Sequence, residues 1–137
     1  MNIVIEPVTN QHFNTLNELF YTMQTHLYAE LNQYQSAKLL LNYLEAPDSI
    51  CLGLFADDEL VGFITGNALN EKTFYFSGLY VEKKYRYYVK RLMSAAENLI
   101  KLRSYKAWIS ESSSKQGNRV LSKFGGLPIE VKYMKEL

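Results

Sequence analysis

The chain has 137 residues, of which 47% are hydrophobic and 21% are charged, and its net charge is +1. A chain of this length is expected to form one domain, residues 1–137, with a proper hydrophobic core. The nearly neutral charge argues against a general nucleic-acid binder, and no apolar run approaches the roughly 20 residues of a membrane span.

The single cysteine, Cys51, excludes an internal disulfide and lies in an apolar run, so we expect it to be buried. The N-terminal residues lack the basic and long apolar segments of a signal peptide. A reducing, cytoplasmic location is therefore expected.

The first half of the chain predicts a strand, two helices and a hairpin. The β-branched residues 3–5 form the strand, which Pro7 ends. Apolar residues spaced three or four apart predict helices from about residue 10 to 27 and from about residue 36 to 45. Two apolar runs around Asp57 and Asp58 predict a β-hairpin over residues 50–66.

The centre of the chain predicts a strand, a helix and a second strand. Thr73–Val81 is rich in aromatic and β-branched residues, and Gly78 inside it indicates a bulge or a close approach to the backbone. An amphipathic helix over about 88–103 and a strand over 105–110 follow. Together they predict a right-handed parallel crossover.

The C-terminal part predicts a short helix over 115–124 and a last strand over 129–134. The order of elements is then β-α-α-β-β-β-α-β-α-β. This order predicts an α/β (α+β) fold, with a mixed central sheet and helices on both faces.

A basic turn joins the strand 73–81 to its helix. Residues 83–91 hold five cations and no acid, while the other 128 residues carry ten cations and fourteen acids, a net charge of −4. A strand, a positive turn and a helix N-terminus are typical of phosphate sites, and the alternative is a solvated basic patch. The basic and aromatic residues also suit single-stranded nucleic acid, but the patch is short and isolated.

Several local patterns appear in the order found in one large family. The hairpin has the tight turn followed by Val61-Gly62-Phe63, and the strand exit has Leu79 and Val81 before Tyr85 and Arg86. The chain thereby resembles the GNAT N-acetyltransferase superfamily over nearly its whole length. The resemblance implies transfer of an acetyl group from acetyl-CoA to an amine, either a small amine or a protein amine. The sequence itself shows no spacing of metal ligands, so no metal is expected.

The resemblance also implies where acyl-CoA binds. In the family the fourth and fifth strands splay apart, the pantetheine arm pairs with the exposed backbone, and the next turn holds the pyrophosphate. On this chain the corresponding cofactor-binding residues are Leu79, Tyr80, Val81, Arg86, Tyr87, Tyr88, Val89, Lys90 and Arg91.

The chain departs from the family at two places. The family's pyrophosphate turn is glycine-rich, whereas residues 86–93 contain no glycine and are about two residues short. Cationic side chains, Lys83 among them, could take over this role. The tyrosine that commonly protonates the leaving thiolate is replaced by Leu121, so Tyr133 and Tyr88 are substitute candidates.

The amine must lose a proton to attack, and carboxylates at strand ends are candidates for the base. Glu82 follows the fourth strand and Glu111 follows the fifth. Surface charge is the alternative for both. His12 and His26 lie on the first helix, and His26 is a possible substrate contact.

Two functions therefore stay open from the sequence. The first is an acyl-CoA-dependent N-acetyltransferase with an unusual phosphate turn. The second is a catalytically degenerate GNAT-fold protein, a possible pseudoenzyme that serves as a binding or structural module in an oligomer or larger assembly such as a virus particle.

Overall fold

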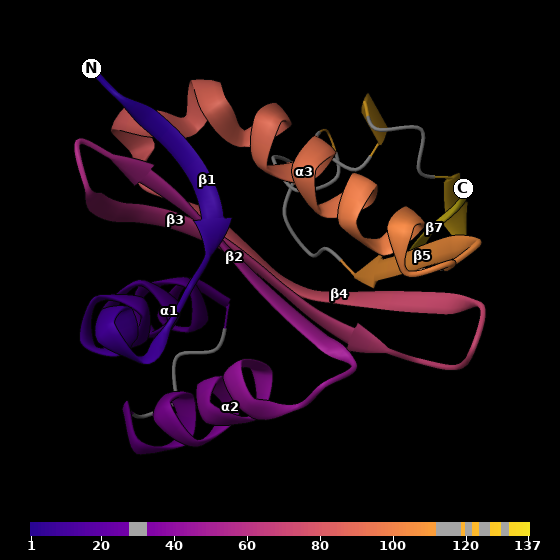
Figure 1. The fold of residues 1–137 in the computed structure, drawn as a ribbon, viewed down its shortest axis with the longest axis horizontal. Coiled ribbons are helices and arrows are strands. Elements are labelled where there is room, and N and C mark those ends of the chain that lie inside the picture. Colours follow the sequence, from indigo (N-terminus) through magenta and orange to yellow (C-terminus); the bar gives the residue numbers. More distant parts are fainter. Residues whose placement is uncertain (28–32, 112–118, 120–121, 124–126, 130–131) are drawn as a thin grey trace.

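The chain folds around one mixed β-sheet with helices on both faces. The computed structural model describes residues 1–27, 33–111, 119, 122–123, 127–129 and 132–137. The sheet has seven strands in the order β1-β2-β3-β4-β5-β7-β6. Helices α1 and α2 lie on one face and α3 lies on the other (Figure 1).

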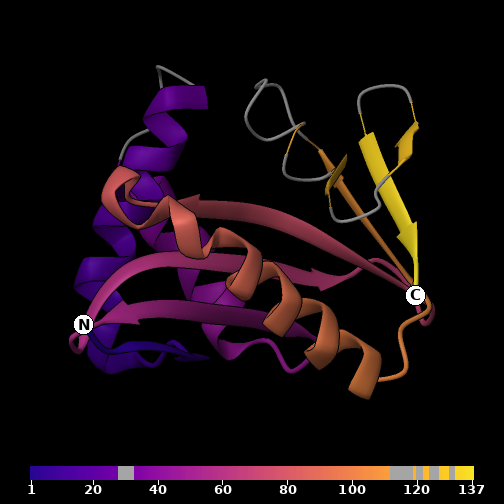
Figure 2. The same cartoon turned by 90° about the horizontal axis from the view of Figure 1, so that it is seen from above.

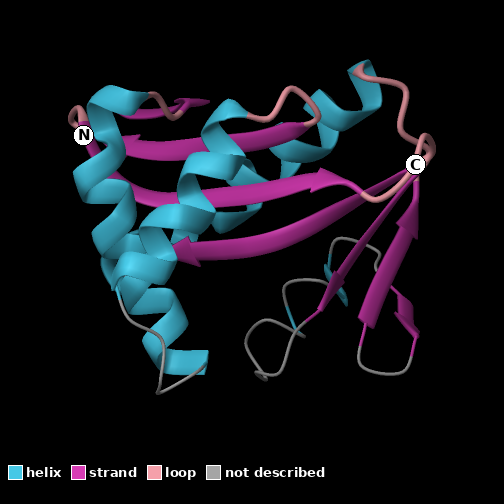
Figure 3. Ribbon diagram, turned by 90° about the horizontal axis from the view of Figure 1, so that it is seen from below, coloured by secondary structure: helices cyan, strands magenta, loops and turns pink. Residues whose placement is uncertain are grey.

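The elements of the first half follow the sequence prediction closely. They are β1 (Ile3–Pro7), the short 3₁₀ helix η1 (Asn10–His12), α1 (Phe13–Leu27), α2 (Gln33–Glu45), β2 (Ser49–Ala56) and β3 (Glu59–Ala68). Figure 3 shows the two helices together on one face of the sheet. Helix α2 ends before Pro47, which has no N–H to continue the helix.

The second half contains β4 (Thr73–Val81), the 3₁₀ helix η2 (Lys83–Tyr88), α3 (Val89–Leu102), β5 (Ala107–Glu111), β6 (Leu127–Ile129) and β7 (Lys132–Glu136). The parallel pairing of β4 with β5 across α3 confirms the predicted crossover. The single last strand predicted over 129–134 is wrong, because two antiparallel strands stand there. The helix predicted over 115–124 lies largely outside the described residues.

The β2–β3 turn has an unusual backbone. Asp57 and Asp58 have φ values of 48° and 70°, which is the pattern of the type I′ turns that match the twist of a two-residue hairpin. The Asp57 Oδ1 atom also accepts a hydrogen bond from the Asn2 N–H at 2.9 Å.

Valine at position 58 is expected to destabilise the protein. A β-branched residue is strained at positive φ, so Asp58→Val should lower the free energy of unfolding by about 1–2 kcal/mol. Asp58→Gly, which tolerates this φ, should stay within about 0.5 kcal/mol of the parent. Urea denaturation of both variants measures the difference, and equal stabilities would contradict this account of the turn.

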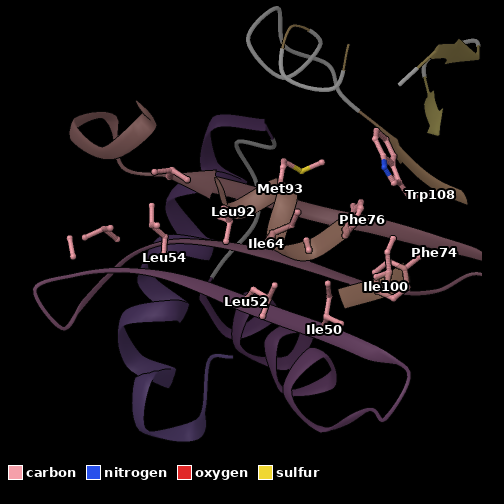
Figure 4. Packing of buried hydrophobic residues seen from close by; sticks show 14 residues of the cluster. Ile50, Leu52, Leu54, Ile64, Phe74, Phe76, Leu92, Met93, Ile100 and Trp108 are labelled. Atoms are coloured by element: carbon pink, nitrogen blue, oxygen red, sulfur yellow. The ribbon is translucent and has the colours of Figure 1, made fainter. Parts of the chain in front are cut away.

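The sheet separates two hydrophobic cores. The α3-side core contains Ile64, Phe76, Leu92 and Trp108, all buried (Figure 4). The opposite core, between the sheet and α1–α2, includes Phe20 and Phe63, whose ring centroids lie 5.8 Å apart, and the buried Cys51. Burial also raises the pKa of the Cys51 thiol to about 12, so this cysteine stays protonated and unreactive.

A charged network ties α3 to the last strands. Glu97 is buried on α3, and its Oε2 atom accepts a hydrogen bond from the Trp108 Nε1–H of β5 at 3.1 Å. Both Glu97 oxygens lie 2.8 Å from the Lys135 Nζ atom of β7. The network therefore fixes β5 and β7 against the helix that follows β4.

Candidate functional site

Strands β4 and β5 pair over only half the length of β4. Their parallel register runs from Thr73↔Ala107 to Phe76↔Ser110 and ends there. The Ser110 hydroxyl donates to the Phe76 carbonyl at 3.0 Å at this last pair. Beyond it the two strands diverge, as Figure 2 shows. In the part of the chain that the structure describes, no strand pairs with residues 78–81 on the β5 side.

A bulge begins the divergence. On the other side of β4, Thr65 of β3 pairs with Gly78, but Gly66 pairs with Phe76, so Ser77 is the extra residue. The bulge expected near Gly78 is thus confirmed. Bulges bend the strand and increase its twist, which turns the rest of β4 away from β5.

The unpaired side of β4 presents backbone hydrogen-bonding groups, and we call it the open edge. The Glu82 N–H donates to the Val61 carbonyl of β3 at 2.9 Å. Because these groups alternate in direction along a strand, those of Tyr80 also face β3. The N–H and C=O groups of Leu79 and Val81 therefore face the open edge, where an extended ligand could pair with them.

Gly78 is required by close packing behind the open edge. A Cβ atom at this position would lie 2.8 Å from the Thr65 Oγ1 atom and 3.3 Å from the Met23 Cε atom of α1. Thr65 is fully buried, so it has little room to move. The glycine lets α1 and β3 approach the bulge closely.

Two of the predicted site residues lie close in sequence or register to the last β4–β5 pair. Glu111 directly follows Ser110 on β5, whose partner on β4 is Phe76. On β7, Tyr133 pairs with Ser110. The backbones of Glu111 and Tyr133 thus lie on neighbouring strands near the end of the β4–β5 pairing, although their side chains lie outside the described part of the structure.

Two hydroxyl groups at the bulge were missed by the sequence analysis. The Ser77 Oγ atom lies 3.2 Å from the Thr65 Oγ1 atom, and Ser77 is half-buried. The signal was Gly78, which indicated a bulge, but only the register shows that Ser77 is the bulged residue. Ser77 supplies a hydroxyl at the end of the open edge nearest Glu111.

The turn after β4 is a 3₁₀ helix rather than a glycine-rich loop. The Tyr85 N–H donates to the Glu82 carbonyl at 2.8 Å, and the Val89 N–H donates to the Arg86 carbonyl. These N–H groups are used within the turn, so they cannot cradle a phosphate. Tyr85, Tyr88 and Val89 are half-buried and pack against the α3-side core, which holds the turn in place.

The outward face of the turn is basic and aromatic. In a 3₁₀ helix, residues three apart lie on the same face, which aligns Lys84 with Tyr87 in η2, and Lys90 follows in the first turn of α3. All three are exposed, as is Arg91, and Tyr87 is 89% exposed. We call Lys84, Tyr87, Lys90 and Arg91 the outer stripe.

Arg86 connects the turn with the open edge. Its Nε–H donates at 3.1 Å to the Val81 carbonyl, one of the groups that face the open edge. The guanidinium therefore lies at the end of the edge away from Ser77. It is the cation best placed to meet a phosphate at the end of an extended ligand.

The remaining candidates lie elsewhere. Glu82 is half-buried at the start of η2, five residues from Ser77, or about 16 Å along an extended strand. His12 packs edge-on against Phe55, with ring centroids 4.8 Å apart, and its Nδ1 atom lies 3.4 Å from the Thr9 nitrogen. These contacts give His12 a structural role, and the side chain of His26 is outside the described residues.

Other possible sites are weaker. A cavity of about 300 Å³ lies between α2, the start of β2 and the end of α3, with Tyr43 and Arg103 in its lining, but it contains no residue of β4. Within the described residues, no group of three or more His, Cys, Asp or Glu side chains could hold a metal ion. No helix in the described part is long and apolar enough to cross a membrane.

Comparison with known proteins identifies similar folds. The profile of the acetyltransferase (GNAT) family matches residues 13–125, and a search of the curated proteins found no match. The PaiA N-acetyltransferase of Thermoplasma acidophilum, solved with coenzyme A, is 21% identical with a TM-score of 0.81 over 100% of both chains. A GNAT-family acetyltransferase of Staphylococcus aureus Mu50 is 16% identical with a TM-score of 0.86 over 99% of each. Aminoglycoside 6′-acetyltransferase type Ii is 18% identical with a TM-score of 0.79 over 97% of this chain and 96% of that chain.

Proposed function

This chain belongs to the acetyltransferase (GNAT) family, and on that premise we propose that it transfers an acetyl group from acetyl-CoA to an amine. The observation that carries the proposal is the open edge of β4, which begins at a bulge and ends at a cation. The resemblance inferred from the sequence, and the α/β fold with a mixed sheet, are confirmed by the family match and the structural neighbours.

The open edge fits the pantetheine arm of the donor. The N–H and C=O groups of Leu79 and the N–H group of Val81 would pair with the amides of the arm like an additional strand, while the Val81 carbonyl accepts from Arg86. From Ser77 to Val81 is about 13 Å along the strand. The thioester would then lie near Ser77, and the first phosphate would lie near Arg86.

Side-chain charge replaces the backbone nest at the phosphate end. Because the Tyr85 and Val89 N–H groups are used within the turn, Arg86 supplies the direct contact. Lys90 and Arg91 are exposed nearby in sequence and add positive potential. Tyr87 does not fill the phosphate position, since its ring is exposed to solvent.

The reaction is an acyl transfer. The neutral amine nitrogen attacks the thioester carbonyl carbon, a C–N bond forms, the C–S bond breaks, and CoA leaves as a thiolate that must take up a proton. We assign the base to Glu111, which directly follows the last β4–β5 pair, in preference to Glu82, which could act only through a chain of water molecules. Tyr133 is the proposed proton donor to the thiolate, since Tyr88 lies at the phosphate end.

Ser77 is proposed to hydrogen-bond to the reacting group. Its hydroxyl lies where β4 leaves β5, and Thr65 holds it at 3.2 Å. A donor in this position can stabilise charge that develops on the thioester oxygen or sulfur.

The free thiol of Cys51 and the proposed use of acetyl-CoA agree with a cytoplasmic location.

Alanine at position 77 is expected to slow the chemical step. Loss of one such donor typically costs about 10²-fold in kcat, and Ser77→Ala should leave the KM for acetyl-CoA nearly unchanged. Steady-state rates of thiol release with a reactive amine measure both constants. Ser110→Ala, which removes a hydroxyl bonded to the backbone, is the matched control, and an equal loss of kcat in both variants would contradict the role of Ser77.

The degenerate binding module remains a second candidate because the turn lacks a backbone nest. Binding of acetyl-CoA distinguishes the transferase from the degenerate binding module. A donor that binds only the folded state raises the melting temperature by mass action. A clear shift at millimolar acetyl-CoA, followed by thiol release with a panel of small amines and lysine peptides, supports the transferase, whereas no shift would exclude it.

A further inference from the structure

We propose that the outer stripe docks an acidic carrier protein, and that the chain accepts acetyl groups from this protein's phosphopantetheine arm as well as from acetyl-CoA. The inference rests on the proposed function, because it concerns the donor for the same open edge. Carrier proteins and CoA present the same arm, and they differ only in what lies beyond its phosphate.

The first argument is the chemistry of the phosphate end. A CoA donor brings a diphosphate, which is best held by several inward N–H groups, and two N–H groups of this turn are used within the 3₁₀ helix. A carrier protein brings a single phosphodiester between the arm and a serine. One guanidinium, that of Arg86 on the Val81 carbonyl, is enough to meet one phosphodiester.

The second argument is the direction of the remaining side chains. Lys84, Tyr87 and Lys90 are exposed, whereas Tyr85 and Tyr88 pack against the α3-side core. The Lys84 Nζ atom lies 5.5 Å from the centre of the Tyr85 ring. Tyr87, at 89% exposure, leaves an aromatic ring in water, although Tyr88 touches its edge at a centroid distance of 5.4 Å. Tyrosine and arginine are enriched among the residues that dominate protein–protein binding, so Tyr87 and the neighbouring exposed Arg91 are the expected anchors of the stripe.

The third argument is charge complementarity. Residues 83–91 carry a charge of +5 on a chain whose other residues sum to −4. An acidic partner would therefore be steered to this segment and repelled elsewhere. Because η2 directly follows β4, a protein docked on the stripe would place its arm at the end of the open edge.

The experiment compares three donors: acetyl-loaded acyl carrier protein of bacterial fatty-acid synthesis, acetyl-CoA, and acetyl-phosphopantetheine, which carries neither protein nor nucleotide. Binding is measured by calorimetry, and transfer by acetylation of a reactive amine. We expect the carrier protein to bind at least tenfold more tightly than acetyl-phosphopantetheine, with an affinity that falls steeply as salt rises.

The double variant Lys84→Glu/Lys90→Glu tests the surface. This variant should weaken the binding of the carrier protein at least tenfold more than it weakens the binding of acetyl-CoA. The matched control is Lys72→Glu/Lys101→Glu, which changes two exposed lysines elsewhere by the same charge and should have little effect on the carrier protein. Circular dichroism checks that both variants are folded.

Each other outcome contradicts the inference. If Lys84→Glu/Lys90→Glu weakened the binding of the carrier protein and of acetyl-CoA equally, the stripe would be a subsite for the CoA nucleotide. A carrier protein that binds no better than the free arm would show that the stripe docks no protein. Transfer from acetyl-CoA alone leaves the proposed function intact, whereas no binding and no transfer with any of the three donors would overturn the proposed function too.

Discussion

Replacement of Glu97 by alanine is expected to lower the free energy of unfolding by about 3 kcal/mol. The change leaves the Nε1–H of the fully buried Trp108 without an acceptor, which costs about 1–3 kcal/mol. It also leaves Lys135 without its partner. The Lys135 side chain is 27% exposed, so water offsets part of the penalty that a buried charge would otherwise bring. Urea denaturation measures the change.

Two variants control for this effect. Glu97→Gln keeps an oxygen that can accept a hydrogen bond from Trp108 and loses only the charge. It should therefore lose roughly half as much stability as Glu97→Ala. Glu136→Ala removes an exposed carboxylate from the same strand as Lys135 and should change stability by about 0.5 kcal/mol or less. If Glu97→Ala were as mild as Glu136→Ala, the network would not fix β5 and β7 to α3.

Arg86→Ala is expected to remove most of the stabilisation by acetyl-CoA. At a ligand concentration of about 100 times Kd, binding stabilises the folded protein by about 2.7 kcal/mol. Loss of a charged hydrogen bond to phosphate costs about 2 kcal/mol, or about 30-fold in Kd. The remaining stabilisation at the same concentration is then about 0.9 kcal/mol. A thermal scan should therefore show a shift in melting temperature about one third as large as that of the parent.

The control for Arg86 is Lys101→Ala, at the far end of α3. Lys101 is exposed, so this variant removes one positive charge without touching the open edge. It should show the full acetyl-CoA shift of the parent. An undiminished shift in Arg86→Ala would place the donor phosphate elsewhere and would argue against the use of the open edge.

The helices and strands before residue 111 could be predicted because their signals are local. The buried faces of α1 and α3 repeat every three or four residues, and Pro7 and Pro47 end elements by removing a backbone N–H. The last strand could not be resolved into β6 and β7 in this way. Both strands are short, and a short alternating pattern does not reveal where it reverses direction.

The site was predictable only in part, because it depends on register between distant segments. Arg86 and Val81 were selected from motifs, and the structure joins them by a hydrogen bond. Ser77 carries no motif. Its importance comes from a shift in the β3–β4 register, in which Thr65 pairs with Gly78 but Gly66 pairs with Phe76. A single sequence does not show strand register. The roles of Glu82, Glu111 and Tyr133 stay predictions.

The divergence of β4 from β5 gives this sheet an unpaired strand edge in its interior, although β4 pairs with β3 and β5 pairs with β7 on their other sides. Outer edges of sheets are sites where chains aggregate, and proteins usually shield them. Here the shielding element would be the substrate, which completes the sheet for the duration of each turnover. If the proposed function holds, the free protein is a sheet with one strand missing, and the hydrogen bonds of a temporary strand would help to set the rate at which CoA leaves.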